Sequence, residues 1–480
     1  MHPLISRPEG TALAAGITRQ VVADIRRGRL RPGERLPGSR PLATSLGVHR
    51  NTVLAALREL EAEGWIRTEP GRGTFVVDTL PEADPLPFAP ASSQAVITPY
   101  PLPEPPPDVL GPTIPPQALP LLGGMPDLRH TPGDALARAW RRALRQGPRV
   151  LGYGDPRGVP ALREALAVHL RALRGLAIDA DDLLITRGAQ QALYLTARAL
   201  LRPGDRVAVE ALGYRPAWEA LRASGAELCP VGVDADGLVV DEVIEAHRHH
   251  PLRAVYLTPH HQYPTTVPLT ATRRITLLRW AAEHGVALIE DDYDHEFHYD
   301  SRPILPLASA DPAGVVIHIG TLSKVFAPGL RLGYLSASPP LLHAATRWRA
   351  LIDRQGDPIG ETAVAELLGD GELHRHVGRM RRIYARRRAA LVEALRENLS
   401  DLMHFDIPAG GMALWARLPE GTDTQAWAQR AADRGVWVQT AARFDFSGRN
   451  LPAMRLGFAA LEEEKLREAV QRLRATWQPA

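Results

Sequence analysis

The chain has 480 residues, of which 45% are hydrophobic and 23% are charged, with a formal net charge of +3 at pH 7. These values are typical of a soluble protein with two or three domains and a large core. The single cysteine excludes an intrachain disulfide framework and a cysteine-based zinc site, and the lack of a long apolar run or a signal peptide predicts a cytoplasmic protein with no membrane partner.

The positive charge is concentrated at the N-terminus. Residues 1–78 carry twelve arginines against eight acidic residues, whereas the rest of the chain is close to neutral. Such an excess favours a polyanionic partner only if the fold presents it on one surface, because a charge excess is otherwise just a solvated face.

Three helices and a hairpin are predicted within residues 1–78. Apolar residues recur at helical spacing over 13–25, and Ser39 is expected to cap a short second helix with Pro41 in its first turn. A third helix is predicted over about 49–64. The β-rich runs WIRT and TFVV follow, joined by EPGRG, which indicates a hairpin. This order predicts a winged helix-turn-helix.

The segment GERLPGSRPLATSLGVHRNTVLAALRELEAEGWIRTEPGRGTFV resembles the DNA-binding domain of the GntR family of bacterial regulators, and the match covers most of residues 12–77. In such a domain the N-terminal end of the third helix enters the major groove. Six residues are therefore expected to contact double-stranded operator DNA: Arg35, Arg40, Arg50, Asn51, Thr52 and, from the wing, Arg72. A small helical domain with no nucleic-acid partner is the alternative.

A linker is predicted over residues 79–116. About one residue in three between Leu80 and Pro120 is proline, with PYPLPEPPP at the centre. Proline-rich segments favour extended, semi-rigid conformations, so the N-terminal domain is expected to be tethered to the rest of the chain.

Residues 117–480 alternate helical segments with six short runs rich in β-branched residues: 183–186, 206–210, 254–258, 286–290, 315–319 and 333–337. This alternation predicts a mainly parallel sheet wrapped by helices, in which ligands bind at the carboxyl ends of strands. A large part is expected over about 150–370. A long helix near 371–397 then leads into a smaller α+β part, about 371–480. The basic run RMRRIYARRR in this helix is interpreted as a solvated face opposite Leu373, Val377, Met380, Tyr384 and Leu391.

Lys324, in GTLSKVFAPGLRLGY, is one of only two lysines in the chain. Arginine stays protonated, whereas a lysine in a confined site can lose its proton and attack a carbonyl to form a Schiff base. The other lysine, Lys465, lies in the charged segment LEEEKLREAV. Lys324 is therefore the predicted nucleophile, with chance placement as the alternative.

Other polar groups follow neighbouring strands. RGAQQAL follows LLIT and opens a helix whose free N–H groups could hold a phosphate. DDYDHEFHYD follows VALIE and places Asp291 and Tyr293 beyond a buried strand, although an acidic run could equally be a metal site or a solvated loop. A reactive lysine, a phosphate site and a carboxylate suited to a pyridinium nitrogen together predict pyridoxal 5'-phosphate (PLP) as the cofactor.

Residues 117–480 resemble fold-type I aminotransferases, and the whole chain resembles the MocR subfamily of GntR regulators. The resemblance implies that Lys324 forms the Schiff base, that Asp291 keeps the ring nitrogen protonated, and that Tyr293 hydrogen-bonds the phenolic oxygen. It also implies a phosphate-binding set: Thr321, Ser323, Arg331 and the N–H groups of Ala189 and Gln190.

Three more residues follow from the same resemblance. Tyr214 would lie against the cofactor ring, or else only pack at a helix start. HHQYPTT stands where aminotransferases carry Asn-Pro-Thr-Gly, so Gln262 or Tyr263 is expected to supply the contact to the phenolic oxygen. Arg455 of MRLGF would bind the carboxylate of a substrate or effector, since a guanidinium suits a carboxylate. The alternative for Arg455 is a structural role at a domain interface.

The paired His260 and His261 are interpreted as loop packing, so no metal is predicted. Together these features predict a PLP-dependent transcription regulator that senses PLP itself, or an amine or amino acid that condenses with it. By similarity it is expected to form a head-to-tail homodimer. The alternatives are a functional aminotransferase with an accessory DNA-binding domain, and a PLP-binding chaperone without DNA affinity.

Overall fold

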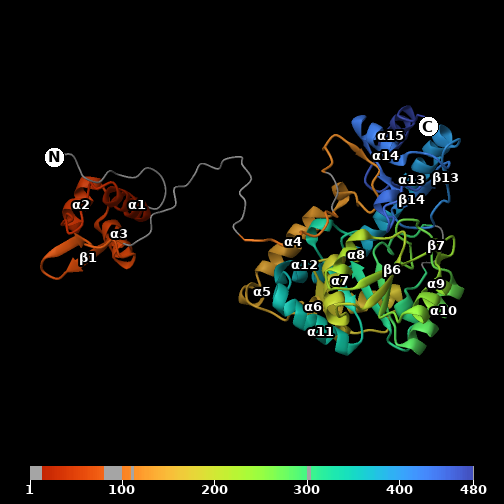
Figure 1. Ribbon diagram of the computed structural model, residues 1–480, viewed down its shortest axis with the longest axis horizontal. Coiled ribbons are helices and arrows are strands. Elements are labelled where there is room, and N and C mark those ends of the chain that lie inside the picture. Colours follow the sequence, from red (N-terminus) through yellow and green to blue (C-terminus); the bar gives the residue numbers. More distant parts are fainter. Residues whose placement is uncertain (1–12, 81–99, 110–112, 300–303, 479–480) are drawn as a thin grey trace. The chain divides into compact units, whose positions relative to one another are not determined.

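The computed structural model describes residues 13–80, 100–109, 113–299 and 304–478. The chain divides into two units, Met1–Pro103 and Glu104–Ala480, so the last residues of the predicted linker belong to the second unit (Figure 1). No helix in these described ranges is long and apolar enough to cross a membrane.

The first unit contains the three helices and the hairpin that the sequence predicts. They are α1 (Leu13–Arg26), α2 (Ser39–Leu46), α3 (Arg50–Ala62) and the antiparallel pair β1 (Ile66–Glu69) and β2 (Gly73–Val76). Apolar side chains of all three helices and the hairpin form one core, which includes Ile17, Leu42, Val53, Leu60 and Val76. The prediction that Ser39 caps α2 is wrong: Gly38 is the N-cap, and the Ser39 hydroxyl instead accepts a hydrogen bond from Arg50 Nε (3.2 Å).

A seven-stranded sheet forms the centre of the second unit, in the order β4-β12-β11-β10-β9-β5-β6. Every neighbouring pair is parallel except those of β12, which is antiparallel to both β11 and β4. The strands are β4 (Leu183–Thr186), β5 (Arg206–Glu210), β6 (Glu227–Val231), β9 (Ala254–Leu257), β10 (Ala287–Asp292), β11 (Val316–Thr321) and β12 (Gly333–Ser336). The predicted parallel sheet is thus confirmed, and β6 is an additional strand.

Helices cover both faces of this sheet. One apolar cluster joins the strands to α7 (Ala189–Leu200), α8 (Arg215–Arg222) and α11 (Pro339–Ile352). A second joins them to α9 (Val240–His249) and α10 (Ala271–His284). A third packs α4 (Gly133–Leu144), α6 (Pro160–Arg174) and α12 (Pro358–Gly369) beside β4. This layering leaves the carboxyl ends of the parallel strands as the place where polar loops meet.

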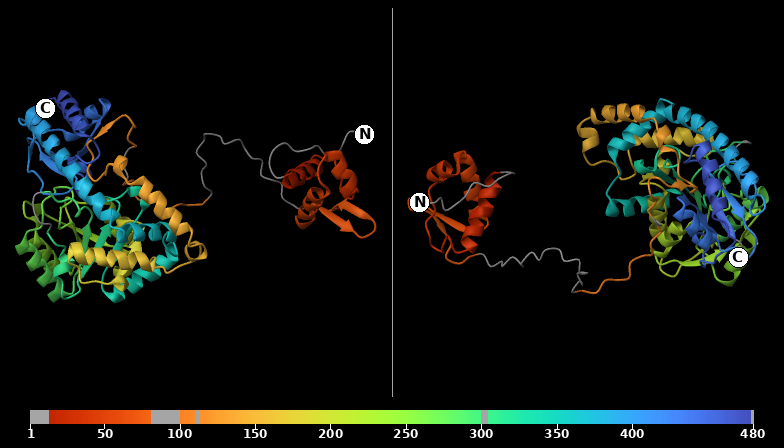
Figure 2. Two further views of the ribbon diagram at one scale, coloured as in Figure 1. Left: turned by 180° about the vertical axis from the view of Figure 1, so that it is seen from behind. Right: turned by 90° about the horizontal axis from the view of Figure 1, so that it is seen from above.

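The small subdomain lies at one end of the second unit (Figure 2). It follows the long helix α13 (Glu372–Leu399) and contains α14 (Thr424–Asp433), α15 (Glu463–Ala475) and a four-stranded sheet, β13-β14-β17-β16. The strands are β13 (His404–Phe405), β14 (Ala413–Arg417), β16 (Gln439–Thr440) and β17 (Ala453–Gly457). The predicted inward residues of α13 are all buried. The solvated-face interpretation is wrong for Arg387, which is buried because it pairs with Asp127 at 2.8 Å.

The chain just after the predicted linker enters the small subdomain as a strand. β3 (Leu119–Pro120) pairs in parallel with β15 (Val436–Trp437), and Leu121 N–H donates to the Trp437 carbonyl at 2.9 Å. The chain then passes directly to Gly123 and Gly124, which lie at the carboxyl ends of the large sheet's strands. The main chain therefore runs directly from β3 to the polar loops.

Two glycines on neighbouring strands allow an unusually close approach there. A Cβ atom on Gly320 would lie 2.2 Å from the ring of Tyr334, and one on Gly333 would lie 2.7 Å from the Gly188 carbonyl carbon. Because Cβ atoms do not tolerate such contacts, β11, β12 and the start of α7 can meet only with glycine at both positions.

Candidate functional site

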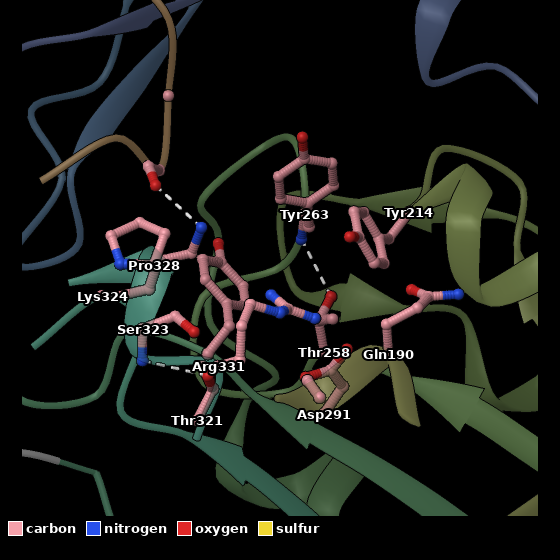
Figure 3. Close-up of a pocket in the computed structure, with 14 residues that line it drawn as sticks. Gln190, Tyr214, Thr258, Tyr263, Asp291, Thr321, Ser323, Lys324, Pro328 and Arg331 are labelled. Atoms are coloured by element: carbon pink, nitrogen blue, oxygen red, sulfur yellow. Dashed lines mark hydrogen bonds between the residues drawn. The ribbon is translucent and has the colours of Figure 1, made fainter. Parts of the chain in front are cut away.

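A cavity of about 180 Å³ lies at the carboxyl ends of β10 and β11 (Figure 3). All ten residues predicted to hold the cofactor line it. The complete lining is Gly123, Gly124, Ala189, Gln190, Tyr214, Thr258, Tyr263, Asp291, Tyr293, Thr321, Ser323, Lys324, Pro328 and Arg331. The structure therefore brings together side chains from five separate strand ends, and their individual binding roles stay predictions.

Lys324 projects into this cavity from the loop after β11. Its Nζ donates to the Gly124 carbonyl at 2.8 Å (Figure 3). Burial lowers the pKa of the amine, and the positive charges of Arg455 and Arg331 act in the same direction. A lowered pKa makes the neutral, nucleophilic form of the amine more accessible.

Asp291 lies near the end of β10 with its two carboxylate oxygens in different surroundings. Oδ2 accepts a hydrogen bond from the Tyr256 hydroxyl at 2.9 Å, whereas Oδ1 is buried with no partner among the described residues. Burial raises the pKa of this carboxyl to about 6. An unpartnered buried oxygen needs a donor, so the site suits a ring N–H of a bound group.

The opposite end of the cavity is built to hold an anion. Gly188, at φ 77°, is the N-cap of α7, so the first N–H groups of that helix face the cavity at Ala189 and Gln190. Arg331 lies beside them, and its Nη2 donates to the Arg187 carbonyl at 2.9 Å. Thr321 and Ser323 also line the cavity, and the Thr321 hydroxyl accepts the Ser323 N–H at 3.1 Å and donates to the Leu332 carbonyl at 3.3 Å.

Aromatic rings form the remaining wall. Tyr263 stands edge-on to Tyr214 and Tyr293, with ring centres 5.4 and 5.8 Å apart, and its N–H donates to Thr258 Oγ1 at 2.9 Å. The Tyr293 hydroxyl already donates to the His261 carbonyl at 3.0 Å. The Gln262 amide is used within its own loop and by the Leu212 carbonyl, so of the two alternatives only Tyr263 lines the cavity.

Arg455 lies in β17 directly behind this wall. It is fully buried, and its guanidinium carbon is 4.5 Å from the centre of the Tyr263 ring. Gly123 separates it from the cavity, since a Cβ there would overlap Arg455 Nη1. Nε and Nη1 have no hydrogen-bond partner within the described part of the chain. A buried guanidinium with unused donors points to a carboxylate that the ligand supplies.

Sequence reasoning missed several wall residues. Gly123 and Gly124 carry no side chain that could signal a role, and Lys324 meets Gly124 from 200 residues away. Thr258 ends a strand, and its hydroxyl bonds the buried Glu210 carboxyl at 2.8 Å. Burial raises the pKa of Glu210 to about 8. Glu210 is therefore mostly uncharged at neutral pH. It accepts the hydrogen bond of the Thr258 hydroxyl, which in turn accepts the Tyr263 N–H.

Of the neighbouring histidines, His261 has a hydrogen-bond partner inside the protein, whereas His260 contacts a neighbouring ring. His261 Nδ1 lies 2.7 Å from Asp294 Oδ1, and the His260 ring centre lies 4.6 Å from that of His295. All four side chains are buried. Within the described ranges no group of histidine, cysteine or acidic side chains is arranged to hold a metal ion.

The residues predicted to contact DNA lie on the surface of the first unit. Arg50 and Asn51 begin α3, and His49 caps this helix by accepting the Asn51 N–H at 3.3 Å. The Arg35 guanidinium packs against Gly73 of the wing, where Arg72 also projects, paired with Glu69 at 2.6 Å. Five of the six predicted residues are exposed, and Thr52 is half-buried.

Comparisons with known proteins identify a related family for each of the two units. Residues 124–473 match the model for aminotransferase class I and II, and residues 13–76 match the model for bacterial regulatory proteins of the gntR family. The probable rhizopine catabolism regulatory protein MocR of Rhizobium meliloti is 30% identical, with 95% of this chain and 92% of that protein covered. The pyridoxine biosynthesis transcriptional regulator PdxR of Corynebacterium glutamicum is 32% identical, with 82% and 81% covered.

The second unit also has solved relatives. The kynurenine aminotransferase of Pyrococcus horikoshii, crystallised with pyridoxamine phosphate, superimposes with a TM-score of 0.70 at 30% identity, and the match covers 75% of this chain and 90% of that one. The cavity's amine, its anion-binding end and the unpartnered Asp291 oxygen suit PLP, which carries an aldehyde, a phosphate and a ring nitrogen.

The buried Glu210 gives a testable pH dependence. Its pKa is about 8 in the folded protein against 4.5 when exposed, so the folded state retains a proton that the unfolded state has lost. The free energy of unfolding of the second unit should therefore fall as the pH rises from 4.5 to 8, by up to about 1.4 kcal/mol per pH unit. Glu210→Gln, a neutral mimic, should reduce this slope in urea unfolding, most clearly between pH 6 and 8, above the pKa of about 6 of the buried Asp291. The exposed Glu283→Gln should leave it, and an unchanged slope in Glu210→Gln would show that Glu210 is not the titrating group.

Proposed function

The chain belongs to the MocR subfamily of GntR-type transcription regulators, and we propose that its PLP-binding second unit senses an amine or amino acid and thereby controls operator binding by the first unit. One observation carries this proposal. A single cavity combines a lysine of lowered pKa, an anion-binding helix start and a carboxylate oxygen without a partner. These groups are suited to hold PLP and an amine beside it.

PLP supplies an aldehyde that bonds covalently to amines. Lys324 Nζ is the group that would attach it, and it would give up its hydrogen bond to Gly124 in doing so. Asp291 Oδ1 would accept the ring N–H, which is the one partner that this oxygen lacks. The phosphate would lie between Arg331, Thr321, Ser323 and the N–H groups of Ala189 and Gln190. Tyr263, Tyr293 and Tyr214 would enclose the ring.

The effector's carboxylate would be bound by Arg455. Its buried, unused donors favour a charged partner. The guanidinium lies behind Tyr263 and Gly123, beside the cavity wall. A carboxylate at either edge of the guanidinium would form charge-assisted hydrogen bonds with one of these unpartnered nitrogens. An amino acid fits this arrangement better than a simple amine, because only the amino acid supplies that group.

A functional aminotransferase is the second candidate. It is favoured by the superposition on the Pyrococcus horikoshii enzyme and by the complete set of amine-binding groups in the cavity. The GntR-type domain favours a regulator, and its expected partner, operator DNA, supports a location in the cytoplasm. Steady-state turnover of an amino acid with a keto acid would favour the enzyme.

The assignment of Lys324 can be tested by chemical trapping. Borohydride reduction of the PLP-loaded protein should fix the cofactor to the peptide that contains Lys324. Lys324→Ala should abolish both the label and the visible absorbance band. Lys465→Ala is the matched control, because Lys465 is exposed and paired with Glu468 at 2.6 Å, and it should behave like the wild type. Recovery of the label on Lys465 would refute the assignment.

DNA recognition by the first unit can be tested at the start of α3. Arg50→Ala should weaken binding to an operator fragment selected from genomic DNA by about tenfold or more, because a contact to a base edge contributes roughly 1 to 3 kcal/mol. Arg58→Ala, in the same helix but further from its N-terminal end, is the control and should have a smaller effect. Cofactor absorbance should be unchanged in both. Full operator affinity in Arg50→Ala would remove this residue from the contact surface.

A head-to-tail homodimer is supported by an exposed apolar patch on the second unit. Leu151, Tyr153 and Leu351 are 67%, 81% and 79% exposed. The Arg354 guanidinium lies 3.9 Å from the Tyr153 ring, so the two segments that form the patch are adjacent. Sedimentation velocity of the full chain at micromolar concentration should give a dimer that Leu351→Glu weakens. A wild-type monomer would contradict the proposal.

A further inference from the structure

A second cavity, of about 230 Å³, lies beside the cofactor cavity. The rings of Tyr214 and Tyr263 line both cavities, and the Phe444 ring centre is 5.3 Å from that of Tyr263 on the side of the second one. Because the two cavities share these rings, a ligand that occupies the first can extend its distal part into the second.

The strand pair β16-β17 contributes Gln439 to the second cavity and lies behind the wall of the first. Gln439 is the direct cross-strand partner of Arg455, so their side chains lie on the same face of the sheet. Gln439 lines the second cavity, and its Oε1 is buried with no hydrogen-bond partner among the described residues. Its amide can present either the oxygen or the NH₂ group to a ligand. An unpartnered polar group at this place indicates a polar ligand.

The charges around the second cavity favour an anion. Two guanidinium groups, of Arg215 and Arg443, face it together with one carboxylate, of Asp108. Arg443 is half-buried and held in place, since its Nη2 donates to the Val109 carbonyl at 2.9 Å. Arg215 lies 3.9 Å from Glu219 and is more exposed. Arg443 is therefore the better placed of the two to select a ligand.

We propose that the second cavity is the subsite for the distal part of the effector, and that Arg443 recognises an acidic terminal group there. The effector would then be an amino acid with an acidic side chain, its α-carboxylate at Arg455 and its second anionic group at Arg443. This assignment rests on the proposed function of the cofactor cavity and adds the class of ligand.

Two amino acids that differ only at the end of the side chain test the proposal. The full-length protein loaded with PLP is titrated with L-glutamate and with L-glutamine while the absorbance of the bound cofactor is followed. L-Glutamate should bind about tenfold tighter or more, the size expected of a charge-assisted hydrogen-bonded pair. Arg443→Gln should lower the affinity for L-glutamate to that for L-glutamine and leave the latter unchanged. Arg443→Lys, which keeps the charge, should retain part of the preference.

Two further variants serve as controls. Arg449→Gln alters an exposed arginine of the same loop, paired with Asp445, and should keep the full preference. Arg455→Gln should weaken both amino acids equally. Equal affinities in the wild type, no response to either amino acid, or a preference that survives in Arg443→Gln would each overturn the subsite while PLP binding stands. Failure of the wild type to bind PLP would instead refute the proposed function, and the subsite with it.

Discussion

The close approach of β11, β12 and the start of α7 brings Lys324 together with the predicted phosphate-binding groups of the cofactor cavity. Glycine at positions 320 and 333 permits it, because any side chain there would overlap Tyr334 or the Gly188 main chain. The loops that carry Lys324 and Arg331 leave from these two strands, and the anion-binding helix start lies against them. A larger residue at either glycine would separate the lysine from the phosphate-binding end, and overpacking in such a place typically costs about 1 to 3 kcal/mol.

Several buried charges around the sheet are paired with an opposite charge. Arg174 lies between Asp292 and Glu296, and His318 lies 3.2 Å from Glu290. Within the described part of the chain, Asp291 has only the Tyr256 hydroxyl as a hydrogen-bond partner, and Arg455 has two unused nitrogens. Removing charged groups from water without a partner is costly, so these two residues are held in an energetically unfavourable state. A ligand with a ring N–H and a carboxylate would relieve both.

Much of the fold and of the cofactor cavity could be predicted from the sequence, because the signals for them lie in short local stretches. The six predicted strands match the observed ones within about two residues, because each is a short apolar run between polar loops. β6 was not predicted because Pro230 and polar neighbours interrupt its pattern. The burial of Arg387 was not predicted because it depends on a residue distant in sequence. Helical spacing places Arg387 in a basic run, but only the folded chain brings Asp127 to it. Gly124, Glu210 and Arg443 also acquire their roles through distant contacts that no local pattern records.

The strand β3 has a consequence for how such a protein can diverge. It follows the predicted linker and precedes the wall of the ligand cavities, and Val109, ten residues earlier, is held by Arg443. The DNA-binding domain could therefore be exchanged by recombination upstream of residue 104 without disturbing the ligand site. Mutations in the cavity could likewise change the ligand without changing the operator. The stretch from residue 113 to Gly124 leads into the cavity wall of the second unit, and selection should tolerate insertions there least of all.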